Sequence, residues 1–180
     1  SHFYSSPDVV VCHPNGQIGI FGYPEEVFPP TDSHTATLVD NRIIIVGNLS
    51  YPEARKPGIT PVLILDLNTF AISTVVTLGT PPGWIHKHSA SLSADGKSIL
   101  VQRGKIDRGS NGSSFVENID DWQLRINGWQ WERLTERQWQ RWEFRRANRR
   151  PNHLWEIEQA LWSRTVKWEK EFNEQMEELV

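Results

Sequence analysis

The feature that most constrains the fold of this chain is a strand-turn-strand pattern that occurs twice. The segment DSHTATLVDNRIIIVGN at residues 32–48 returns as IHKHSASLSADGKSILVQRG at residues 85–104. Aligning His34 with His88 gives an offset of 54 residues between the copies. Repeats of about fifty residues are typical of stacked architectures, in which each unit covers the hydrophobic face of its neighbour.

Further matches and turn signals extend this pattern. The same offset places residues 9–11 on residues 63–65, and LNTFAI (67–72) aligns with INGWQW (126–131) as a degenerate third copy. Five dipeptides that tolerate positive φ separate short aliphatic runs and predict five β-hairpins, with about ten strands in all. They are Asn15-Gly16, Asp40-Asn41, Asn68-Thr69, Asp95-Gly96 and Asn127-Gly128.

The longest connections are rich in Gly, Pro, Ser and Asn, which predicts two long loops at residues 48–61 and 102–118. The runs RIIIVG and VLILDL are nearly continuous aliphatic stretches, which suit strands buried on both faces. We therefore expect a mainly β fold in which antiparallel four-stranded units stack face to face, as blades do in a β-propeller. A β-sandwich made from the same hairpins is the structural alternative.

At this point the residues resemble a known family. The first copy contains, in order, a Pro-Pro pair, His34-Thr-Ala-Thr-Leu, an aliphatic strand ending at Gly47-Asn48, a variable loop and a closing strand ending at Phe70. In this order the first copy resembles a kelch repeat. The second copy keeps Pro81-Pro82, His88 and Trp129, although its glycine lies at Arg103-Gly104. The resemblance covers about residues 8–134 and implies kelch-like β-propeller blades whose loops recognise other proteins.

The repeats make about two and a half blades, whereas a closed propeller needs at least about four. We expect an open stack to leave hydrophobic sheet surface that another element covers. The candidates are upstream sequence, a second copy of the chain in a homo-oligomer, and the Trp-rich C-terminal segment.

The C-terminal third differs in composition from the rest of the chain. Residues 132–150 hold seven Arg and three Glu, and eight of the nine Trp follow residue 121. Thr135 and Gln138 form a capping box that predicts the start of a helix, and Pro151 separates it from a second helix. The predicted domains are therefore kelch-like β repeats at 1–134 and a Trp- and Arg-rich helical hairpin at 135–180.

Composition narrows the class of protein. The net charge is -3, and no apolar run approaches the roughly 20 residues of a membrane span. Cys12 is the single cysteine and forms no internal disulfide, so we expect a cytoplasmic protein. Because Cys12 lies alone on a predicted strand, we expect its thiol to be buried and inert. Because the chain starts at Ser1 rather than Met, it is also a candidate piece of a longer protein.

Side chains suited to catalysis are few. His86 and His88 lie two residues apart, on one face of a predicted strand, but zinc needs three or four ligands. Asp120 and Asp121 are adjacent and are interpreted as a solvated loop end. We therefore expect a non-enzymatic chain without a cofactor or metal.

The favoured interpretation is a protein-protein interaction module. Tyr, Trp and Arg dominate interface energetics, so the predicted contacts combine the long loops and the tail. They are Tyr51, Arg55, Lys56, Arg103, Arg108, Phe115 and Trp139. The alternatives are a metal-dependent enzyme using His86 and His88, and RNA binding through the Arg137, Arg141 and Arg145 face of the predicted arginine helix. The acidic net charge argues against nucleic acid as a partner, and no membrane contact is expected.

Overall fold

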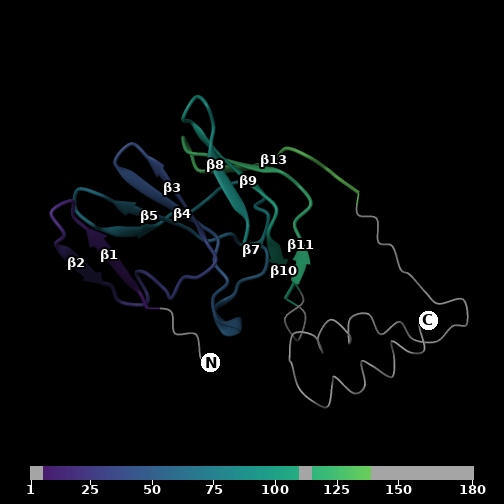
Figure 1. Cartoon of the computed structure of the whole chain (residues 1–180). Helices are drawn as coiled ribbons and strands as arrows, with labels where there is room; N and C mark the ends of the chain where they lie inside the picture. The colour runs from purple at the N-terminus through teal and green to yellow at the C-terminus, as the bar shows by residue number, and fades with distance from the viewer. Residues whose placement is uncertain (1–5, 110–114, 139–180) are drawn as a thin grey trace, which may run out of the picture. The chain divides into compact units, whose positions relative to one another are not determined.

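The computed structural model describes residues 6–109 and 115–138 (Figure 1). The chain divides into two compact units after Gln138, and all described residues belong to the first unit. They form thirteen strands and one short 3-10 helix, η1 (Pro52–Ala54), so this unit is mainly β. Every pairing between these strands is antiparallel.

The first four-stranded sheet is a meander in chain order. It consists of β3 (Thr35–Val39), β4 (Arg42–Val46), β5 (Val62–Asp66) and β6 (Ile72–Thr74). Its central strands are buried on both faces, as the continuous aliphatic runs predict. Ile44 packs into one hydrophobic cluster and Ile45 into another, so this sheet forms the middle layer of the unit.

The second four-stranded sheet repeats this meander. It consists of β8 (Ser89–Leu92), β9 (Ser98–Gln102), β12 (Trp122–Arg125) and β13 (Gln130–Arg133). A third sheet consists of β7 (Trp84–His86), β10 (Lys105–Asp107) and β11 (Phe115–Glu117). β7 precedes β8 in the sequence, whereas β10 and β11 lie between β9 and β12. The prediction of about ten strands and of an unstructured 102–118 loop was wrong here, because short strands lie within that polar, glycine-rich segment.

The backbone confirms the internal repeat beyond the strand order. Ser33 and Lys87, equivalent at the 54-residue offset, have φ of 56° and 53°, and Phe70 and Trp129 have φ of 55° and 50°. A positive φ is uncommon in residues other than glycine, so the same unusual geometry at matched positions indicates one backbone plan used twice. Both strand-turn-strand segments that contain Phe70 and Trp129 are extended.

The hairpin of β1 (Asp8–Cys12) and β2 (Ile18–Gly22) packs on the face of the first sheet that points away from the second sheet (Figure 1). Phe21 stacks on Phe70 with ring centroids 4.3 Å apart. Val9 packs against the same cluster, whereas Val10 is 58% exposed. An offset of 54 pairs Val9, which faces the first sheet, with Leu63, which faces back toward β1–β2. The offset for β1 therefore differs from 54 by one residue, because a one-residue shift reverses every side chain of a strand.

All five predicted turns join paired antiparallel strands, and those hairpins are confirmed. Only Asp40-Asn41 is a two-residue connection, and the other four are longer. Positive φ occurs within or beside each predicted dipeptide, at Gly16, Asp40, Phe70, Gly96 and Gly128. The dipeptides therefore predict the place of each reversal better than its type.

One hydrophobic cluster joins the two four-stranded sheets through Ile44, Val62, Ile99, Val101 and Leu124. The opposite face of the second sheet is polar except for Leu100. Strand alternation and register place these residues on it: Ser89, Ser91, Leu100, Gln102, Gln123, Arg125, Gln130 and Glu132. The expectation that an open stack leaves hydrophobic surface uncovered was therefore wrong for this end. It holds at β1–β2, where Val10, Ile18 and Ile20 are exposed.

Two further expectations are corrected. Residues 135–138 are not helical, because Thr135 Oγ1 accepts from the N–H of Asp121 and donates to Asp120 instead of capping a helix. The remainder of the predicted helical hairpin, 139–180, lies outside the described residues. Cys12 is exposed rather than buried, since its side chain lies on the outer face of β1. Within the described ranges, no helix has the length and apolarity to cross a membrane.

Candidate functional site

The long loop 48–61 begins at a buried amide that fixes its path. Asn48 Oδ1 accepts hydrogen bonds from the N–H groups of Asp32 and Ser50, and its Nδ2 donates to the carbonyl of Pro30. Asn48 is 3% exposed, so satisfying three of its polar positions avoids a large desolvation cost. The loop therefore leaves β4 in one defined direction.

A buried ion pair holds the middle of this loop against the third sheet. Arg55 Nη1 lies 3.2 Å from Asp107 Oδ2, and the two side chains are 8% and 9% exposed. Arg55 also donates from Nε to the carbonyl of Leu49 and from Nη2 to that of Ser50. Its guanidinium lies 4.9 Å from the centroid of the Phe115 ring. The two long loops predicted from the sequence therefore meet at Arg55.

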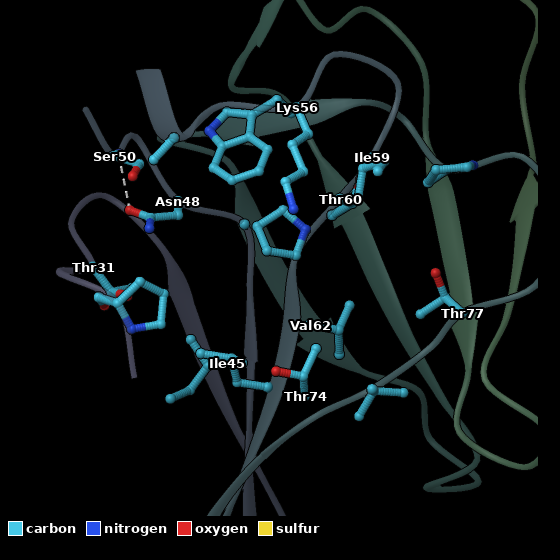
Figure 2. A pocket seen from close by; sticks show the side chains of 18 of the residues that line it. Thr31, Ile45, Asn48, Ser50, Lys56, Ile59, Thr60, Val62, Thr74 and Thr77 are labelled. Carbon is cyan, nitrogen blue, oxygen red and sulfur yellow. Dashed lines mark hydrogen bonds between the residues drawn. The ribbon is translucent and has the colours of Figure 1, made fainter. Parts of the chain in front are cut away.

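Beside this loop lies a groove of about 760 Å³ (Figure 2). Three segments and the first sheet form its walls: the 25–31 segment, loop 50–61, the 74–81 segment, and Ile45 and Leu63 of the sheet. Figure 2 shows Lys56 extending from the rim between Asn48 and Thr60, with Val62 and Thr74 on the opposite wall. Most of the lining is apolar, which is typical of a site that binds apolar groups.

The rim of the groove carries exposed hydrophobic side chains and a few charges. Ile59 is 51% and Val76 is 85% exposed. Glu25, Glu26 and Lys56 provide charge of both signs. Lys56 has no ion-pair partner among the residues that the structure describes. An apolar floor with a charged rim suits an extended segment that combines hydrophobic and charged side chains.

The structure divides the predicted contact residues into three groups. Tyr51 and Lys56 are exposed beside the groove, with Tyr51 45% exposed. Arg55 and Phe115 come together, but Arg55 is committed to Asp107 and supports the loop from within. The remaining predicted contacts are Arg103 and Arg108, which are exposed, and Trp139, which lies outside the described residues.

The histidine pair does not share one strand face as predicted. Lys87 has φ of 53°, which breaks the extended backbone between His86 in β7 and His88 before β8. His86 packs edge-on against Phe115, with centroids 4.7 Å apart, and His88 Nε2 lies 2.8 Å from Thr35 Oγ1. Burial lowers the pKa of both imidazoles, and the neighbouring charges lower it further. Residues 6–109 and 115–138 contain no group of three or more His, Cys, Asp or Glu side chains placed to hold a metal ion.

The acidic pair at 120–121 is an anchor, and its interpretation as a solvated loop end was wrong. Asp120 is 6% exposed and accepts hydrogen bonds from Arg133, Thr135 and the N–H of Arg137. Asp121 pairs with Arg137 at 2.7 Å. Of the three arginines in the RNA alternative, Arg137 is thus ion-paired, while Arg141 and Arg145 lie outside the described residues.

Sequence reasoning missed several residues that shape the groove. Asn48 was interpreted only as part of a glycine-containing strand end, and Asp107 only as part of the long loop 102–118. Trp84 donates from Nε1 to the carbonyl of Leu49 and lines the groove. A lone Trp among Gly and Pro residues outside the Trp-rich tail was the available signal for Trp84.

The groove is identified as a candidate site from the arrangement of its own residues. A scan against protein-family models and a search of curated proteins both found no match for the chain.

Proposed function

We propose that this chain is a protein-protein interaction module built on kelch-like β repeats, and that the groove beside loop 48–61 is its recognition site. The observation that carries the proposal is an apolar groove whose bounding loop is held by the buried Arg55–Asp107 pair. A loop fixed before binding loses little conformational freedom when a partner is bound, which favours recognition.

The two matched meanders support the kelch-like part of the proposal. Each has four antiparallel strands in chain order, and the sheets stack through a shared hydrophobic cluster. The long connections of both repeats meet at one place, where Arg55 lies over Phe115. In such an arrangement loops from successive repeats form one continuous surface. The predicted contribution of Trp139 from the tail is kept as part of the proposal.

The composition of the groove indicates what kind of partner it takes. Its lining includes the aliphatic residues Ile45, Val62 and Leu63. It also includes Lys56 and several threonines, which Figure 2 labels. We infer that the partner presents an extended peptide with aliphatic or aromatic side chains and a carboxylate within reach of Lys56. The hydrophobic contacts supply most of the affinity and the Lys56 contact supplies orientation.

The test is a selection of displayed random peptides against the full chain. Clones that bind the wild type are then measured against an Ile59→Asp, Val76→Asp double variant. Two carboxylates at the apolar rim are expected to weaken binding by about tenfold or more, because each must lose water when the peptide binds.

The matched control is Leu134→Asp. Leu134 is 44% exposed and does not line the groove, so its replacement changes charge and exposure without touching the site. Thermal unfolding of all variants establishes that they are folded. Peptides that bind the double variant as tightly as the wild type would show that the groove is not the recognition site.

A further inference from the structure

The second repeat docks onto the first through its leading histidine. His88 Nε2 lies 2.8 Å from Thr35 Oγ1, a residue at the start of β3. The ring also lies over Gly47, at the end of β4, where an added Cβ would be 2.6 Å from His88 Cε1. The β3–β4 hairpin therefore provides both the hydroxyl and the glycine that hold this histidine.

His34 is the counterpart of His88 in the first repeat, and it is exposed. By the same plan, His34 would rest on a hairpin equivalent to β3–β4 that precedes it. Two residues of β3, the strand that follows His34, are also more exposed than their counterparts in β8. Leu38 is 59% exposed, whereas its counterpart Leu92 is 38% exposed. Ala36 is exposed, whereas its counterpart Ala90 is partly buried against the cluster between the sheets.

The edge of β1 gives an independent indication that this position is open among the residues that the structure describes. The β1–β2 pair corresponds to β5–β6, and β5 is paired along its other edge with β4. In the described part of the chain, β1 is paired with β2 alone. An open strand edge presents a row of N–H and C=O groups that can pair with an added strand.

We propose that the β1 edge and the His34–Leu38 face form one binding surface for a β-hairpin supplied by a partner polypeptide. The hairpin pairs with β1 as β4 pairs with β5, and it carries a hydroxyl and a glycine against His34. Its chemistry is that of β3–β4 itself, with one Ala- and Thr-containing strand and one aliphatic strand. This surface is separate from the groove, so the proposal does not depend on the proposed function.

Two features argue against a second copy of the chain as the occupant. A symmetric contact through the outer face of β1–β2 would bury Val10, Cys12, Ile18 and Ile20 against their own copies, and it would leave the edge of β1 unpaired. A head-to-tail contact would place the polar outer face of the second sheet on this apolar one. Neither arrangement supplies a strand to β1.

The experiment uses the full chain and a synthetic peptide with the sequence of residues 32–48, DSHTATLVDNRIIIVGN, as the probe. Binding is measured by titration, and backbone hydrogen exchange locates it. We expect exchange to slow in residues 8–12 and 34–38, and not in loop 50–60. A Leu38→Asp chain is expected to bind the peptide at least about tenfold more weakly, since the added carboxylate would lie beneath the docked hairpin.

Two matched controls accompany this measurement. Leu134→Asp, at an exposed position away from β1, is expected to bind within about twofold of the wild type, a change well under 1 kcal/mol. A peptide carrying Gly47→Val is expected to bind at least about tenfold more weakly, because its side chain would fill the place of the His34 ring. Circular dichroism and thermal unfolding check that the variant chains are folded.

The outcomes that would overturn the proposal differ from those that concern the groove. Slow exchange of residues 8–12 in the chain without peptide, together with no binding, would mean that the chain covers this edge itself. Concentration-dependent protection with a doubled solution mass would assign the surface to self-association. Equal binding by the wild-type and Leu38→Asp chains would also overturn it. None of these results changes the expected behaviour of the Ile59→Asp, Val76→Asp variant.

Discussion

Arg55 and Asp107 form an ion pair between the long loop of one repeat and the third sheet inserted in the next, with Nη1 and Oδ2 3.2 Å apart. Replacing Arg55 with Met is expected to destabilise the chain by about 3 to 5 kcal/mol, because it leaves the Asp107 carboxylate buried without its partner. Urea denaturation of the full chain measures this loss.

The control for Arg55 is the pair of Lys105 and Glu117 in the same sheet, whose side chains are 46% and 57% exposed. Lys105→Met is expected to cost about 0 to 1 kcal/mol, as exposed ion pairs do. If the two variants lose equal stability, the ion pair does not anchor the loop. An Arg55→Met, Asp107→Leu double variant is expected to recover part of the loss.

Gly47 is expected to tolerate no side chain. Its φ is 72°, and an added Cβ would lie 2.4 Å from the Ile85 carbonyl oxygen and 2.6 Å from His88 Cε1. Gly16 has a similar φ of 83° but no atom within 4 Å of its added Cβ. Gly16→Ala therefore measures only the free-energy cost of placing a side chain at a positive φ, about 1 kcal/mol. Gly47→Ala should lose at least twice as much stability in the same denaturation experiment, and equal losses would place Gly47 outside the packed contact.

The stability of the first unit is expected to fall as the pH decreases from about 6.5 to 4. Burial, together with the smaller effects of His34 and His86, lowers the pKa of His88 to about 4. Above pH 6.5 His88 is neutral in both states, whereas between 6.5 and 4 only the unfolded chain binds a proton there. The His88 contribution to this loss is about 3 kcal/mol.

His88→Gln provides the comparison, because its side chain does not titrate in this range. Stability is measured by denaturation at pH 7, 6, 5 and 4 for both chains, and the wild type should show the steeper decline. His86 remains in the variant and contributes in the same direction, since its pKa is also lowered by burial. Parallel pH profiles would show that His88 titrates normally in the folded chain.

Asp120 is expected to hold the segment that follows β13. Burial alone raises the pKa of Asp120, but the N–H of Arg137 and the side chains of Arg133 and Thr135 outweigh burial and lower it. Its charged form therefore stabilises the fold above the unfolded pKa, and this contribution is lost as the pH falls through the lower folded value.

Asp120→Asn is expected to cost about 2 kcal/mol and to speed hydrogen exchange at Arg137, because hydrogen bonds to a charged acceptor become neutral. Asp121→Asn is the neighbouring comparison, since Asp121 is more exposed and pairs with a half-exposed Arg137 side chain. A larger effect at Asp121 than at Asp120 would contradict this assignment.

The repeat and the reversals were predictable from sequence because they depend on local signals. Aliphatic runs and Asn- or Asp-containing dipeptides identified all four central strands and five hairpins. The one-residue error in β1 arose because three consecutive valines, Val9-Val10-Val11, carry no alternation that distinguishes one face from the other. Only the contact between Phe21 and Phe70 decides which valine points inward.

The groove and its support could not be predicted in the same way. Arg55 and Asp107 are 52 residues apart, and nothing in either loop marks the other as its partner. Asp120 resembled a solvated turn residue because one of its partners, Arg137, lies in a segment with a strong helical signature. Predictions from local patterns fail where tertiary hydrogen bonds take over a residue that would otherwise cap a helix.

The insertion of β10 and β11 into the second repeat has a consequence for engineering. Because Arg55 pairs with Asp107, loop 48–61 of the first repeat is held in place by the second repeat. The two repeats therefore cannot be exchanged for one another. If loop 48–61 is grafted into another scaffold, residues 105–117 must go with it, and shortening that insertion should relax a loop that lies in a different repeat.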